Sequence, residues 1–120
     1  MLMKILLVED NEPMRRTVKS FIGDLVDEFV ECSNGCEAFD MYTQHRPDLV
    51  LMDIQMNDEG GLTATRKIKE SFPEARVVIV SQWDGLGVRE MARAAGAESH
   101  VSKTDLLPLR VLLGAGRQKW

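Results

Sequence analysis

Polar side chains that could do chemistry stand at four places where an apolar run of the sequence ends. Glu9 and Asp10 close the first run. The residues that follow later apolar runs are Asp53, Ser81 and Lys103. Carboxylates, a hydroxyl and an ammonium group are the components that position a phosphoryl group and neutralise its charge. If the fold brings these residues together, we expect phosphoryl transfer to an aspartate.

Such a site also predicts a cation. Three neighbouring carboxylates repel one another, and some of them would hold a proton in the absence of a cation. Oxygen ligands that leave positions open for water suit Mg²⁺, which would offset the charge and orient an incoming phosphoryl group. Lys103 would add a mobile positive charge, and Ser81 a hydroxyl donor. We therefore expect Mg²⁺ as the cofactor.

The elements that must position these residues alternate along the chain. Five short segments rich in branched apolar residues are typical of strands. These strands are expected at 3–8, 28–33, 48–53, 76–81 and 99–102. Apolar residues recur at helical spacing after each strand, with Gly96 ending the fourth helix and Pro108 in the first turn of the last. That last helix is expected to run from about 105 to 113.

Unbroken apolar strands belong in a parallel sheet that is covered on both faces. The predicted fold is therefore α/β: a doubly wound, five-stranded parallel sheet of order 2-1-3-4-5 with five helices, a flavodoxin-like sandwich. In such sheets, ligands bind beyond the carboxyl ends of the strands, at the switch in strand order. The fold would thus gather the polar strand ends at one edge.

Length and composition limit the functional classes. A chain of 120 residues fits one domain over 1–120, with 113–120 as the possible start of a linker. A net charge of -4 makes the domain a poor candidate for binding nucleic acid directly. It has no apolar run of about 20 residues and no signal peptide, so we expect a cytoplasmic protein without membrane contact. Cys32 and Cys36 lack the usual zinc spacing and are expected to be free thiols.

The sequence resembles the response-regulator receiver family of two-component signalling over about residues 3 to 113. The matching segments are ILLVEDN (5–11), DLVLMDIQM (48–56), VVIVS (77–81), AAGA (94–97) and then Lys103. Each is weak alone, and their shared order and separation make them specific. The resemblance implies that Asp53 accepts a phosphoryl group from a histidine kinase or a histidine phosphotransfer protein. It also implies that the chain is no enzyme beyond its own phosphorylation and dephosphorylation.

The resemblance further assigns roles to the site residues. Asp10, Asp53 and the backbone carbonyl of Gln55 would bind Mg²⁺ directly, with Glu9 acting mainly through water. The residues that would bind the phosphoryl oxygens are Ser81 and Lys103. Gln55 and Trp83 would flank the path of the water that hydrolyses the acyl phosphate. Trp83 has two open interpretations, a lid over the site or an ordinary loop aromatic.

His100 occupies the position at which the family usually has a Tyr or Phe that reorients on activation, and a half-buried histidine with no switch role is the alternative. Activation would draw the Ser81 hydroxyl to the phosphoryl group and change the face formed by the fourth helix, fifth strand and last helix. That face is a plausible homodimer surface. Two departures from the family pattern are Asn57 and Thr104, each in place of a usual proline. Thr104 resembles receivers with a helix-turn-helix output, which favours control of transcription through an output domain.

Three other functions are compatible with parts of this pattern. One alternative is a stand-alone or degenerate receiver, a protein-binding module that never takes phosphate. A flavin carrier needs a glycine- and hydroxyl-rich phosphate loop where this chain has acids after its first strand. A haloacid-type phosphatase has a second Asp two residues after its nucleophile, where Gln55 stands. Both of these last alternatives fit poorly.

Overall fold

The computed structural model describes residues 3–54, 60–83 and 85–117 and shows one five-stranded sheet. All of its strand pairs are parallel, in the order β2-β1-β3-β4-β5. The strands are β1 (Lys4–Val8), β2 (Glu28–Cys32), β3 (Leu49–Asp53), β4 (Val77–Ser81) and β5 (Ser99–Ser102). The helices are α1 (Glu12–Ile22), the 3-10 turn η1 (Gly23–Leu25), α2 (Gly35–His45), α3 (Gly61–Ser71), α4 (Leu86–Ala95) and α5 (Leu107–Arg117). The predicted fold class and strand order are confirmed.

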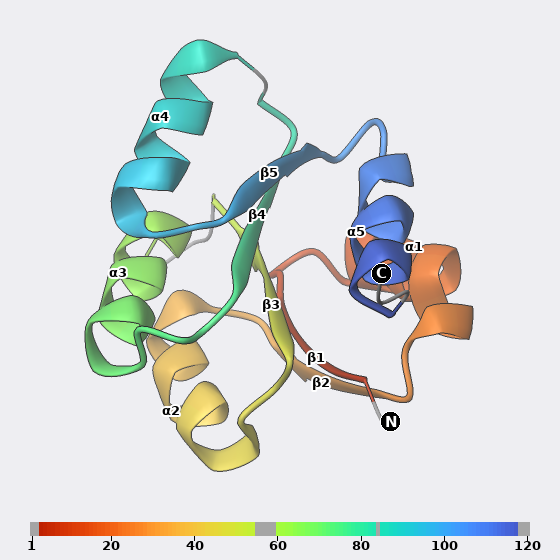
Figure 1. Cartoon of the computed structure of the whole chain (residues 1–120), viewed down its shortest axis with the longest axis horizontal. Helices are drawn as coiled ribbons and strands as arrows, with labels where there is room; N and C mark the ends of the chain where they lie inside the picture. The colour runs from red at the N-terminus through yellow and green to blue at the C-terminus, as the bar shows by residue number, and fades with distance from the viewer. Residues whose placement is uncertain (1–2, 55–59, 84, 118–120) are drawn as a thin grey trace.

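Helices cover both faces of the sheet, as the apolar strands require. Helices α1 and α5 lie on one face, and α2, α3 and α4 lie on the other (Figure 1). Successive strand residues point to opposite faces, so Ile5 and Leu7 pack in the core beneath α1 and α5. Leu6 and Val8 pack in the core beneath the other three helices. The sheet thus divides two apolar cores.

Short polar side chains and a glycine set the helix boundaries. The Asn11 side chain accepts a hydrogen bond from the Met14 N–H at 2.8 Å, and this caps the start of α1. Asn34 caps α2 in the same way, accepting from the Glu37 N–H at 2.9 Å. At the end of α4, Gly96 has φ +103°, a left-handed conformation that glycine adopts without strain.

The last helix differs from its prediction. It begins at Leu107, where the Asp105 carboxylate accepts the N–H of Leu107 at 3.2 Å, and it continues to Arg117. The predicted end at 113 is too early, because a helix that docks through Leu109 and Leu113 tolerates Gly114 in its next turn. Residues 113–117, expected as the start of a linker, are therefore helical. Within the described ranges, no helix has the length and apolar character needed to cross a bilayer.

Candidate phosphoryl-transfer site

The register of the sheet aligns the carboxyl ends of its strands. Val8 pairs with Met52, so Glu9 and Asp53 are the next residues on two adjacent strands. On the other side of β3, Asp53 pairs with Val80. The Lys103 main-chain N–H then donates to the Ser81 carbonyl at 2.8 Å. Parallel pairing alone therefore gathers residues that lie far apart in the sequence.

Three carboxylates meet at this edge. One oxygen each from Glu9, Asp10 and Asp53 lies within 4.8 Å of the others. Glu9 and Asp53 are each only 3% exposed, and Asp10 is half-buried. An all-oxygen donor set fits Mg²⁺, because this small hard cation prefers carboxylate ligands and keeps several waters.

A single ammonium group lies among these acids. The Lys103 Nζ is 3.0 Å from Glu9 Oε1 and 3.2 Å from Asp53 Oδ1. Burial lowers the pKa of Lys103, but its hydrogen bond to Glu9 and the charges of Asp53 and Glu9 outweigh burial and raise that pKa. Lys103 therefore stays charged, and it bridges two carboxylates that would otherwise repel.

The carboxyl group of Glu9 has a raised pKa. Burial, together with the charge of Asp53, raises its pKa to about 7, although Lys103 and the Asn11 N–H oppose the rise. One lysine does not compensate the buried acids fully. A site with this excess of negative charge is suited to a divalent cation.

A close backbone approach fixes the start of α3 against the end of β3. A Cβ atom on Gly61 would lie 1.9 Å from the Asp53 carbonyl oxygen, so only glycine fits there. The predicted roles of Gln55 and Asn57 fall outside the described residues. The peptide bond between Lys103 and Thr104 is trans, like every peptide bond in the described ranges.

Ser81 and His100 meet through the main chain of Trp83. Ser81 is buried, and its Oγ accepts a hydrogen bond from the Trp83 N–H at 3.0 Å. The His100 Nε2 lies 3.1 Å from the Trp83 carbonyl oxygen. The Trp83 side chain is 49% exposed. One residue of the β4–α4 loop is therefore held at both ends, by the site hydroxyl and by the proposed switch residue.

Sequence reasoning did not find this link. It treated Trp83 only as an aromatic side chain, whereas the structure uses its peptide N–H and carbonyl. A main-chain contact leaves no signature in residue type, so only the spacing of Ser81 and Trp83 could have suggested it. The bridge from Lys103 to Glu9 was also missed, because Lys103 was assigned solely to a phosphoryl oxygen.

Comparison with known proteins identifies relatives over most of the chain. The family model described as "Response regulator receiver domain" matches residues 5–109. The polar-differentiation response regulator DivK of Brucella anthropi is 35% identical over 106 residues, which cover 87% of this chain and 86% of DivK. The chemotaxis protein CheY of Halobacterium salinarum is 34% identical over 100 residues, covering 83% of each chain.

Solved structures agree with the fold. A two-component response regulator of the LuxR family from Aurantimonas superposes with a TM-score of 0.83 at 29% identity, covering 98% of this chain and 89% of that one. The BeF3-activated receiver domain of Klebsiella pneumoniae RstA gives a TM-score of 0.82 at 26% identity, covering 96% and 99%. The five-stranded architecture is thus shared with proteins of known structure.

Proposed function

This chain belongs to the response regulator receiver family, and from that premise we propose that Mg²⁺-dependent phosphoryl transfer to Asp53 sets its signalling state. The donor would be a phosphohistidine on a histidine kinase or a histidine phosphotransfer protein. The observation that carries the proposal is the Lys103 ammonium, 3.2 Å from Asp53 Oδ1 and 3.0 Å from Glu9 Oε1. It brings a cation to a buried carboxylate at the edge where ligands bind in this fold.

The chemistry follows from these groups. An Asp53 carboxylate oxygen attacks phosphorus, the bond from phosphorus to the donor imidazole nitrogen breaks, and an acyl phosphate forms. Lys103 exchanges a carboxylate contact for a phosphoryl oxygen, and the Ser81 hydroxyl donates to another. Bound Mg²⁺ would supply charge neutralisation and orientation. Asp10 and Asp53 would hold it directly, with the Gln55 carbonyl, and Glu9 would act through water.

In this proposal the chain catalyses only its own phosphorylation and dephosphorylation and acts on no other substrate. The test is incubation with a small acyl-phosphate donor and Mg²⁺, followed by intact mass measurement. One alkali-labile phosphoryl group should appear, and chelation or Asp53→Asn should remove it. Equal labelling of the Asn variant would defeat the assignment, and an unlabelled wild type would favour the degenerate protein-binding module.

We further propose that phosphorylation changes the surface formed by α4, β5 and α5, and that this surface transmits the signal. Movement of the Ser81 hydroxyl toward the phosphoryl group would release the Trp83 N–H, and the His100 contact with the Trp83 carbonyl would change with it. The effect is a shift between two packings of the same fold. Leu86 on α4 and Val111 on α5 are 79% and 63% exposed, which suits a surface that a partner or a second copy covers.

Control of transcription would require an output domain. The LuxR-family regulator at 29% identity and the Thr104 departure both support that direction. Light scattering with and without a beryllofluoride phosphate mimic tests the switch, and a dimer should form only with the mimic. A monomer in both states, with unchanged amide spectra on this face, would contradict it.

A further inference from the structure

We propose that Arg15 is a positioning residue that holds the β1–α1 loop in its metal-binding shape, an inference that rests on the proposed Mg²⁺ site. The Arg15 Nη1 donates a hydrogen bond of 2.6 Å to the Glu9 carbonyl oxygen. Glu9 begins the loop, and Asp10 follows it directly. Arg15 is therefore hydrogen-bonded to the peptide unit that joins Glu9 to Asp10, two of the three clustered carboxylate residues.

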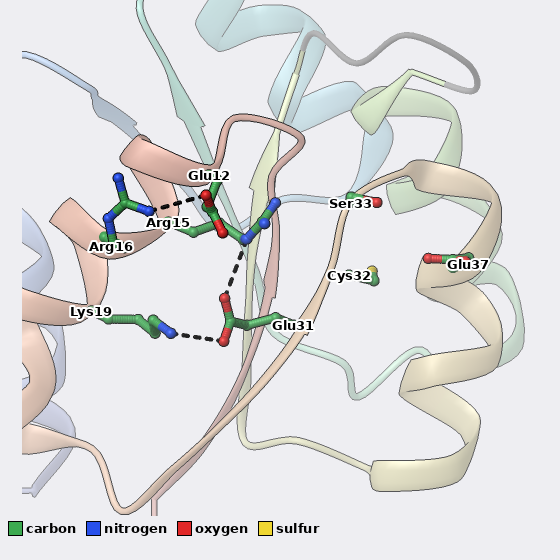
Figure 2. Close-up of a pocket in the computed structure, with 8 residues that line it drawn as sticks. All are labelled: Glu12, Arg15, Arg16, Lys19, Glu31, Cys32, Ser33 and Glu37. Atoms are coloured by element: carbon green, nitrogen blue, oxygen red, sulfur yellow. Dashed lines mark hydrogen bonds and ion pairs between the residues drawn. The ribbon is translucent and has the colours of Figure 1, made fainter.

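The guanidinium is itself held in place. Its Nε lies 3.3 Å from Glu31 Oε1, and Lys19 Nζ lies 2.8 Å from Glu31 Oε2. A surface pocket of about 580 Å³ opens between α1, the end of β2 and the start of α2, and these side chains line it. Figure 2 shows the Arg15 guanidinium directed toward Glu31, with Lys19 reaching the same carboxylate from one turn further along α1.

Arg16 gives a matched comparison on the same helix. Its side chain is 63% exposed and pairs with Glu12 at 3.1 Å, four residues earlier. The Arg15 side chain is only 19% exposed. The two side chains leave α1 in different directions (Figure 2). Two adjacent arginines thus carry the same charge, and the described contacts join Arg15 to the site loop and Arg16 to a surface acid.

The Asp10 carboxylate needs support from its backbone. Within the described part of the chain, no hydrogen bond or ion pair is made by the Asp10 side chain. By contrast, the Glu9 carboxylate accepts the Asn11 N–H at 3.2 Å and contacts Lys103, and the Glu9 N–H donates to the Cys32 carbonyl at 3.1 Å. The direction of the Asp10 side chain therefore depends on the Glu9–Asp10 peptide, whose carbonyl Arg15 holds.

The direction in which Mg²⁺ affinity changes when Arg15 is replaced distinguishes a positioning role from a purely electrostatic one. A positive guanidinium near a cation site repels Mg²⁺, so a purely electrostatic role predicts tighter Mg²⁺ binding when Arg15 is removed. A positioning role predicts weaker binding, because the carboxylates lose their arrangement. A lysine at this position keeps the charge but cannot place two donors in the fixed fork of arginine, so it should restore binding only in part.

The experiment is Mg²⁺ titration of the unphosphorylated full chain, followed by the backbone amide resonances of residues 9–11. Arg15→Ala should raise the apparent Kd about tenfold, equivalent to about 1.4 kcal/mol. Arg15→Lys should fall between that variant and wild type. Arg16→Ala, the control, should bind Mg²⁺ as wild type does.

Amide spectra of the sheet residues establish whether each variant is folded. If Arg15→Ala does not fold, the Mg²⁺ affinity of Arg15→Lys still tests the proposal. A Kd for the Arg15 variants equal to or tighter than that of wild type would overturn the positioning role while leaving the Mg²⁺ site intact. If the amide resonances of residues 9–11 in the wild-type protein do not shift when Mg²⁺ is added, both this inference and the proposed metal site are overturned.

Discussion

The two ends of the parallel sheet both carry charged side chains, but they use them differently. At the amino ends of the strands, Arg76 makes two hydrogen bonds of 2.9 Å with the Glu98 carboxylate. The Lys4 main-chain N–H donates to Asp48 at 2.8 Å. The Arg76 and Glu98 side chains are 45% and 34% exposed, and each acid has a matched donor. Such contacts join neighbouring strands and contribute little to stability individually.

At the carboxyl ends, three acids cluster, and one lysine contacts two of them, Glu9 and Asp53. Glu9 and Asp53 are buried there, and burial raises the pKa of Glu9 to about 7. A buried excess of one charge is costly, and a fold keeps it where function requires it. Charge balance and burial, more than the mere presence of ionisable residues, therefore distinguish the carboxyl edge of this sheet from its amino edge.

The largest expected effect comes from removing one cationic side chain at each end of the sheet, Lys103 at the carboxyl end and Arg76 at the amino end. Lys103→Met should slow phosphorylation by an acyl-phosphate donor about 100-fold, because a donor to the transferring group is lost. Arg76→Met should leave that rate unchanged and lower the free energy of unfolding by at most about 1 kcal/mol. Rates come from intact mass against time, and stabilities from urea unfolding. Equal slowing in both variants would mean that the ends do not differ in function.

A smaller effect concerns the lifetime of the acyl phosphate. If the Trp83 indole covers the approach of water, Trp83→Ala should accelerate dephosphorylation about tenfold, or about 1.4 kcal/mol in the barrier. Trp83→Phe keeps an aromatic ring and should decay at nearly the wild-type rate. Trp83 is 49% exposed, so the test distinguishes a lid over the site from an ordinary loop aromatic. An unchanged rate in Trp83→Ala, with a strong change in Gln55→Ala, would show that the indole points away from the site.

The smallest expected effect is on the free energy of unfolding in the presence of Mg²⁺. Mg²⁺ at five times its Kd should raise the free energy of unfolding by about 1 kcal/mol, since it binds the native state. Asp10→Ala should abolish this gain and should stabilise the metal-free protein by relieving repulsion. Asp48→Ala, at the opposite end, should lower the baseline stability and keep the Mg²⁺ gain. A gain that survives Asp10→Ala in thermal unfolding would place the metal elsewhere.

Much of this architecture was predictable because strong local signals agree with the fold. The apolar strands required a sheet covered on both faces, and the parallel register then gathered Glu9, Asp53 and Lys103 without further information. Helix α5 was placed less well, because Gly114 is a local stop signal that the docking of Leu109 and Leu113 overrides.

The contacts that sequence reasoning missed are made by main-chain atoms. Trp83 holds Ser81 and His100 through its N–H and carbonyl, and Arg15 holds the Glu9 carbonyl. Residue types do not encode which peptide group a side chain reaches, since that depends on the three-dimensional path of the loop. The acids of the site were therefore predictable, whereas the contacts that hold them in position were not.

The buried Asp53 carboxylate is proposed as the group that takes phosphate. Borohydride reduction of the freshly phosphorylated protein converts an aspartyl phosphate to homoserine, and tandem mass spectrometry then locates the altered residue. The structure predicts homoserine at position 53 and an unaltered residue at Asp10 and at Asp48. Homoserine at either of those positions, with Asp53 unchanged, would rule out Asp53 as the phosphoryl acceptor.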